Sequence, residues 1–162
     1  MNPKIVVPPE QLPGMNRIAA DYSTHAPGAA GFFAGDYREP EVWLHKAEEV
    51  QRATRADRRR VIEALRRQQE QLNAGPQSMA ALAALASPDA LAIVTGQQAG
   101  LFGGPLYTLY KALTTCKLAR YWSGRLGKPV VPVFYVVSED HDFIEVQGAG
   151  YLEGGQHYKK AI

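Results

Sequence analysis

The chain has few of the features that would assign a function at sight. It contains one cysteine, Cys116, in 162 residues, which excludes an internal disulfide framework and is typical of a reducing compartment. Its formal net charge is only +2, so the composition indicates neither nucleic acid nor a membrane as a partner. No apolar run reaches the length of a membrane span, and the prolines among residues 1–15 exclude a signal peptide. We therefore expect a cytoplasmic protein of one domain.

Two familiar phosphate-binding loops are also missing. Residues 96–104 read GQQAGLFGG, in which Gln98 and Leu101 stand where a G-x-G-x-x-G fingerprint has its second and third glycines. No Gly-Lys-Ser or Gly-Lys-Thr occurs anywhere, so the chain has no Walker loop. A nucleotide-dependent kinase is therefore the weakest of the functional hypotheses.

Residues 91–137 have the pattern of a strand, a turn, a long helix and a second strand. Residues 91–95 and 130–137 are short apolar runs rich in β-branched residues, which is typical of buried parallel strands. Pro105 stands where proline is favoured in a first helical turn, and Gly127 ends the helix. The sequence therefore predicts an α/β fold with a Rossmann-like parallel βαβ core. Because only two parallel strands are evident, we expect an incomplete doubly wound domain.

The long helix is expected to turn one apolar face to the sheet. Leu106, Leu109, Leu113 and Cys116 recur at helical spacing, and we predict that they form this face. Cys116 would then be a buried structural thiol rather than a nucleophile.

Helices and a hairpin are predicted on either side of this core. The helices are expected at residues 40–50, 54–72 and 79–86, the last one capped by Ser78. Glycines at residues 154–155 predict a hairpin that spans residues 148–162. The predicted organisation is thus an irregular and helical part at residues 1–88, a βαβ core at 89–142 and the hairpin.

The carboxyl ends of the two strands mark the expected site. Ligands of open parallel sheets bind beyond these ends, and the start of the long helix would favour an anion there. The backbone positions expected to approach the ligand are Gly96, Gly100, Gly103 and Gly104.

Four side chains beside this loop are candidates for binding. Gln97 and Gln98 offer amide donors and acceptors for a hydroxyl or carboxylate, although they could instead only tie the loop together. Tyr107 and Lys111 lie four residues apart and share a helix face directed away from the leucines. Lys111 would neutralise an anion at the helix start, and its alternative is a surface lysine beside a tyrosine.

An acidic turn follows the second strand at once. Asp140 and His141 are the candidates for proton transfer, with Glu139 beside them at the site. Ser138 and Asp142 are better suited to capping the next turn. No second histidine or cysteine lies at metal-ligand spacing, so no metal is predicted. The other histidines, His25 among them, have no ionisable cluster around them in the sequence and are expected to have no role.

The whole glycine-containing string is more specific than its glycines. TGQQAGLFGGPLYTLYKA, followed by PVVPVFYVVSEDHDF, closely resembles the bacillithiol biosynthesis cysteine-adding enzyme family, BshC. The upstream segment DYSTHAPGAAGFFAGDY resembles the N-terminal segment of that family, so the likeness covers residues 12–146. Members of the family are much longer, and the chain is expected to be the N-terminal portion of a Rossmann-like ligase domain.

The resemblance implies a ligase that adds L-cysteine to glucosaminyl malate, the last step of bacillithiol biosynthesis. Forming an amide from a free carboxylate requires activation, so ATP or another nucleotide is the chemically expected cofactor. Lys111, Asp140 and His141 are the expected catalytic residues. The resemblance leaves open whether this portion is active alone and whether the full-length protein is a homo-oligomer. The alternative is a ligand-binding or interaction module without catalysis, because an incomplete sheet leaves an unpaired edge for a partner chain.

Overall fold

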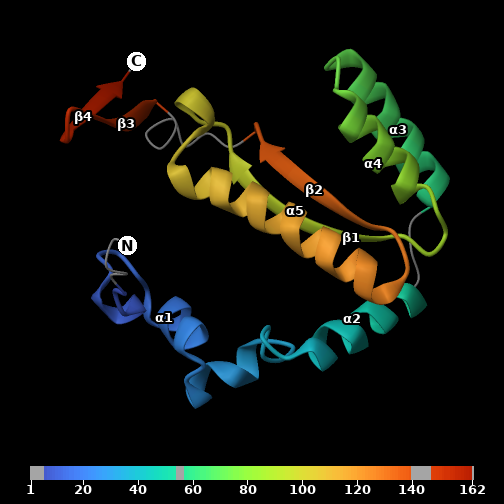
Figure 1. Ribbon diagram of the computed structural model, residues 1–162, viewed down its shortest axis with the longest axis horizontal. Coiled ribbons are helices and arrows are strands. Elements are labelled where there is room, and N and C mark those ends of the chain that lie inside the picture. Colours follow the sequence, from blue (N-terminus) through green and yellow to red (C-terminus); the bar gives the residue numbers. More distant parts are fainter. Residues whose placement is uncertain (1–5, 54–56, 140–146, 162) are drawn as a thin grey trace. The chain divides into compact units, whose positions relative to one another are not determined.

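The computed structural model describes residues 6–53, 57–139 and 147–161, which fall into two compact units (Figure 1). The first unit is Met1–Ala53 and the second is Thr54–Ile162. Each unit is described by itself.

The first unit is helical. Its elements are η1 (Pro9–Gln11), α1 (Arg17–Thr24), η2 (Pro27–Phe32) and α2 (Pro40–Arg52). The Asn16 side chain caps α1 by accepting a hydrogen bond from the Ala19 amide at 2.8 Å. His25 ends α1 in the left-handed region, with φ at 59°, and its amide donates to the carbonyls of Asp21 and Tyr22.

The second unit begins with two helices that pack on each other, α3 (Arg58–Gln71) and α4 (Pro76–Leu85) (Figure 1). Asp57 caps α3, and Ile62 and Leu82 are the buried apolar residues of the pair. The prediction that Ser78 caps the third helix is wrong, because α4 begins at Pro76, three residues before the predicted start, and its N-cap is Gly75. The Ser78 hydroxyl donates instead to Gln69 of α3 at 2.8 Å.

The βαβ core consists of β1 (Leu91–Gln98), η3 (Leu101–Gly103), α5 (Leu106–Leu126) and β2 (Val130–Val137). The strands pair in parallel, with Leu91 opposite Val130 and Gln98 opposite Val137. The predicted α/β class with a parallel βαβ core is therefore confirmed. β1 is longer than predicted, since residues 96–98 belong to the strand and not to the loop.

The face of α5 that packs on the sheet is not the predicted one. Thr115, Ala119 and Trp122 are its buried residues, whereas Leu106, Leu109 and Leu113 are 65%, 55% and 55% exposed. Cys116 is exposed as well, so it is not a buried structural thiol. At about 100° of rotation per residue, the three leucines lie roughly 120–180° around the helix from Thr115, so they face away from it. Small side chains at residues 115 and 119 allow the helix to approach the sheet closely, and spacing alone does not distinguish two such faces.

The predicted hairpin is confirmed as β3 (Gly148–Glu153) and β4 (Gln156–Ala161), which pair antiparallel. Gly154 and Gly155 connect the strands with φ values of 58° and 79°, as a two-residue hairpin turn requires. The rings of Tyr151 and Tyr158 stack across the strands with centroids 5.4 Å apart. β3 contacts η3, so the hairpin lies beside the glycine-rich segment.

Candidate functional site

A cavity of about 670 Å³ lies where α5 begins and β2 ends. Four of the predicted site residues line it, namely Gln98, Gly100, Gly103 and Gly104. Apolar side chains of α5 and β2 complete its wall, among them Leu109, Phe134 and Val136. We call this space the β2 cavity, and its chemistry is an apolar wall beside a glycine-rich backbone.

The glycines of this segment are needed for its backbone path. A Cβ added to Gly100 would meet the Gly104 Cα at 2.8 Å, and one added to Gly96 would meet the Tyr135 carbonyl oxygen at 2.8 Å. Gly104 also has a φ of 81°, which side chains with a Cβ rarely adopt. The segment therefore has to be glycine-rich in order to fold, whatever it binds.

The start of α5 is open at the edge of the β2 cavity. Its N-cap, Pro105, has no side chain that could accept from the helix amides, and the first turn carries no acidic residue. The Thr108 amide donates to the Pro105 carbonyl at 2.8 Å, but the buried Thr108 hydroxyl has no partner among the described residues. The positive end of the helix dipole is therefore uncompensated by its own sequence.

A second group of predicted residues lies elsewhere, on β1 and the adjacent side of α5. The Lys111 ammonium donates to the Gln97 side-chain oxygen at 2.8 Å and to the Gly96 carbonyl at 3.2 Å. The Gln97 side-chain amide donates to the Tyr107 hydroxyl at 3.2 Å, and the Lys111 nitrogen lies 5.1 Å from the centre of the Tyr107 ring. We call Gln97, Tyr107 and Lys111 the edge cluster. None of the three lines the β2 cavity.

Lys111 is half-buried and lacks an acidic partner within residues 6–53, 57–139 and 147–161. Its ammonium donates to a backbone carbonyl and a side-chain carboxamide, both of which are neutral. A cation held in this way keeps its charge available for an anion that comes from outside. Lys111 is therefore not a freely exposed surface lysine, and its role toward an anion stays a prediction.

The acidic turn is described only at its start. Glu139 follows β2 and is exposed, which fits its predicted place at the carboxyl end of the strand. Asp140 and His141 lie outside the described residues, so their proposed role in proton transfer stays a prediction.

Two features are absent from the described part of the chain. It contains no group of three or more histidine, cysteine, aspartate or glutamate residues that could hold a metal ion. It also contains no helix that is both long and apolar enough to cross a membrane.

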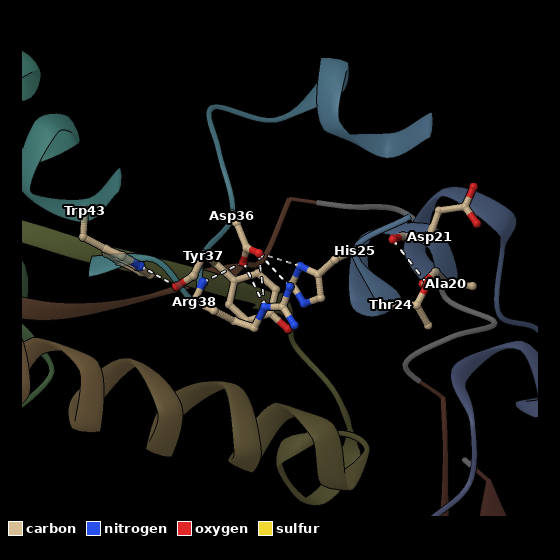
Figure 2. A network of polar contacts seen from close by, with 8 residues as sticks. All are labelled: Ala20, Asp21, Thr24, His25, Asp36, Tyr37, Arg38 and Trp43. Atoms are coloured by element: carbon tan, nitrogen blue, oxygen red, sulfur yellow. Dashed lines mark hydrogen bonds and ion pairs between the residues drawn. The ribbon is translucent and has the colours of Figure 1, made fainter. Parts of the chain in front are cut away.

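The first unit contains an ionisable cluster that the sequence did not indicate. His25 Nδ1 lies 3.1 Å from an Asp36 carboxylate oxygen, and Arg38 Nη2 lies 2.7 Å from the same oxygen (Figure 2). The Arg38 side-chain hydrogen bonds, followed by the one from its amide, lower the pKa of Asp36 to about 2. The expectation that His25 has no ionisable neighbours is therefore wrong.

Aromatic rings surround this cluster. The Tyr37 ring lies 5.2 Å from the His25 ring, and the Trp43 indole donates to the Tyr37 carbonyl at 2.7 Å (Figure 2). The Tyr22 ring also lies 5.2 Å from the Tyr37 ring. A small cavity of about 150 Å³ adjoins His25 and Asp36. Eleven positions separate His25 from Asp36, and no periodicity joins them, so only the fold reveals the pair.

The sequence of the chain matches a described family and many named proteins. The match to "Bacillithiol biosynthesis BshC, N-terminal Rossmann-like domain" covers residues 5–161. A Salinibacter ruber protein named "Putative cysteine ligase BshC" is 40% identical over 147 residues, which are 90% of this chain and 26% of that protein. A Geobacillus kaustophilus protein of the same name is 37% identical over 150 residues, which are 93% of this chain and 28% of that protein.

A third similar protein, from Heliobacterium modesticaldum and again named "Putative cysteine ligase BshC", is 57% identical over 70 residues. That match covers 43% of this chain and 13% of the other protein. The chain thus spans about a quarter of the length of the Salinibacter ruber relative.

Proposed function

The chain belongs to the bacillithiol biosynthesis BshC family, and on that premise we propose that it forms the N-terminal, Rossmann-like part of a cysteine ligase. The reaction joins the carboxyl group of L-cysteine to the amine of glucosaminyl malate and so forms an amide. A free carboxylate is a poor acyl donor, because its oxygen is a poor leaving group. We therefore expect ATP or another nucleotide to activate the cysteine carboxyl group.

One observation carries this proposal. The uncapped start of α5 and the Lys111 ammonium both flank the carboxyl end of β1, where parallel sheets bind their ligands. Both favour an anion, and the substrates and the nucleotide supply several, as carboxylates and phosphates. The β2 cavity beside them gives a less polar part of a ligand a place to lie.

We assign the proton transfer to Asp140 and His141. The amine of glucosaminyl malate must lose a proton as the amide forms, and an imidazole beside a carboxylate is suited to accept it. Glu139 would help to orient them. We also propose the division of the chain into a helical part at residues 1–88, a βαβ core at 89–142 and the hairpin.

The proposed partners are small molecules, L-cysteine and glucosaminyl malate, and the proposed compartment is the cytoplasm. The test is deletion of the gene that encodes the chain. We expect cells without it to lose bacillithiol and to accumulate glucosaminyl malate. Unchanged bacillithiol without accumulation of glucosaminyl malate would contradict a ligase role.

An interaction module without catalysis is a second candidate, and the leucine face of α5 favours it. Leu106, Leu109 and Leu113 form an exposed apolar stripe, which is typical of surfaces that bind another protein segment. Size-exclusion chromatography would separate the two functions. A strictly monomeric chain that adds cysteine would exclude the module, whereas a stable oligomer without turnover would favour it.

A further inference from the structure

The chemistry of the edge cluster fixes the direction of each of its hydrogen bonds. A lysine ammonium can only donate, so the atom of the Gln97 carboxamide that faces Lys111 at 2.8 Å must be its oxygen. The nitrogen of the carboxamide then faces the Tyr107 hydroxyl, at 3.2 Å, and donates to it. The orientation of the amide therefore follows from its neighbour and is not arbitrary.

The Tyr107 hydroxyl has a single proton, and its direction follows from this arrangement. Because the Tyr107 oxygen accepts from Gln97, its own O–H is directed elsewhere, and no acceptor for it lies within the described residues. The Tyr107 side chain is 51% exposed, so this O–H is accessible from solvent. Lys111 and Tyr107 thus carry two donors on one side of α5, and Gln97 connects them.

The position of the cluster is the edge of β1 that faces away from β2. The amides of Leu91 and Ala99 bond to carbonyls next to or in β2, and alternate residues of a strand point to alternate edges. The Gly96 carbonyl that Lys111 contacts therefore points to the other edge of β1, where no strand pairs among the described residues.

We propose that Lys111 and Tyr107 form an oxyanion site at this edge of β1, and that Gln97 positions both donors without touching the anion. The ligand group is a carboxylate or a phosphate, since either presents oxygens to an ammonium and a phenol O–H. Only the identity of the molecule that carries this group rests on the proposed function. The anion site at the β1 edge is thus distinct from the less polar β2 cavity. The charged group of a ligand would bind at the first, and its less polar part would lie in the second.

The experiment uses the whole 162-residue chain labelled with ¹³C and ¹⁵N. Inorganic phosphate and L-malate are titrated separately, and the Lys111 side-chain resonance is followed by NMR. We expect both anions to shift it, and the tighter of the two identifies the source of the natural group. If neither anion shifts the Lys111 resonance at concentrations up to that of the buffer salts, the proposal of an oxyanion site is overturned.

Three variants test the positioning role of Gln97. We expect Gln97→Leu and Tyr107→Phe each to weaken the anion about tenfold, the size of one lost charge-assisted hydrogen bond. The double variant should be no weaker than Gln97→Leu alone, because residues that act through one another are not additive. A hundredfold loss in the double variant would mean that Gln97 contacts the anion itself, which contradicts the inference.

Gln97→Glu separates positioning from a purely structural role. Its carboxylate would pair with Lys111 and take the place of the anion, so binding should disappear while the fold is kept. Retained binding in this variant would contradict the inference, and the outcome does not depend on whether Gln97→Leu folds. Tyr110→Phe and Lys117→Met are matched controls on exposed positions of α5 and should bind as the natural chain does.

The result is independent of the ligase test. Phosphate or malate binding with this pattern would stand even if gene deletion left bacillithiol unchanged, which would overturn only the proposed function. If the protein adds cysteine but the effects of Gln97→Leu and Tyr107→Phe on anion binding are additive, the proposed function would stand and the inference about Gln97 would be overturned.

Discussion

The two ends of the βαβ core differ in how they are packed. At the amino ends of the strands, Leu91, Val130 and Val131 are buried, and Trp122 of α5 is only 5% exposed. At the carboxyl ends, Tyr135 and Val136 of β2 are more than half exposed, as are the first leucines of α5. The same helix and strands therefore supply the core at one end and an open surface at the other.

The difference in packing follows from which helices contact each end of the strands. α4 contacts β2, and Arg58 of α3 donates to the carbonyls of Leu85, Ser87 and Ala90 where the chain turns into β1. No described helix covers the carboxyl ends in this way, and there the segment is rich in glycine. Stability is concentrated at the amino end, and the groups suited to bind an anion lie at the other end.

The largest expected effect on stability comes from removing a buried side chain at the packed end of α5. Trp122→Ala should lower the free energy of unfolding by about 3–5 kcal/mol, because it leaves a cavity in the core. Leu113→Ala, in the exposed part of the same helix, should change it by only roughly 0.5 kcal/mol. Urea denaturation followed by circular dichroism measures both. Equal losses would show that the two ends of α5 are packed alike.

Arg58 gives the next largest effect. Arg58→Met removes a half-buried guanidinium from three carbonyls, and we expect a loss of about 2–3 kcal/mol. Arg59→Met is the matched control, since Arg59 is exposed and next to it in the chain. Thermal unfolding of the two variants should differ clearly. A similar melting temperature for both would contradict the role given to Arg58 at the turn into β1.

Two threonines on the inner side of α5 sharpen the comparison further. The Thr115 hydroxyl donates to the Lys111 carbonyl at 2.8 Å, whereas the buried Thr108 hydroxyl has no partner among the described residues. Thr115→Val should therefore cost about 1 kcal/mol, and Thr108→Val should be neutral or slightly stabilising. Parallel urea titrations measure the difference, and a costly Thr108→Val would reveal a partner for its hydroxyl.

The smallest effect is expected in the first unit and depends on pH. Hydrogen bonds from Arg38 lower the pKa of Asp36 from 3.8 to about 2, so the carboxylate stabilises the folded unit above pH 3.8. This contribution is lost as the pH falls through about 2, and the partly exposed position of Asp36 keeps it small.

The measurement compares the natural chain with Asp36→Asn by NMR, using the Trp43 indole as a reporter of the first unit. The difference in stability between them should be constant near neutral pH and should vanish toward pH 2. A difference that grows on acidification would mean that the pKa is shifted in the other direction.

Much of the fold could be predicted from local signals. The strand at residues 130–137, the end of α5 at Gly127 and the hairpin at Gly154 and Gly155 each rest on propensities that act over a few residues. The inner face of α5 could not be predicted, because both of its sides satisfy helical spacing and only the sheet selects the one with Ala119. The pairing of His25 with Asp36 likewise depends on the fold of the chain between them.

The roles of the candidate site residues stay predictions, and their arrangement could not be predicted from the sequence. Gln97 and Gln98 are neighbours in sequence, yet the Gln97 side chain bonds to Lys111 in the edge cluster, whereas Gln98 lines the β2 cavity. The sequence predicted one crevice, whereas the structure has two separate surfaces, the edge cluster and the β2 cavity. The family resemblance was confirmed because it rests on long strings of residues, which carry more information than the glycines alone.

The most direct test of this contrast is amide hydrogen exchange measured by mass spectrometry. The chain is compared alone and with millimolar ATP, L-cysteine and glucosaminyl malate. We predict that residues 115–126 and 130–133 are protected without ligands, and that residues 96–113 gain protection only when the ligands are present. Equal protection of both ends without ligands, or a gain confined to other segments, would contradict the account.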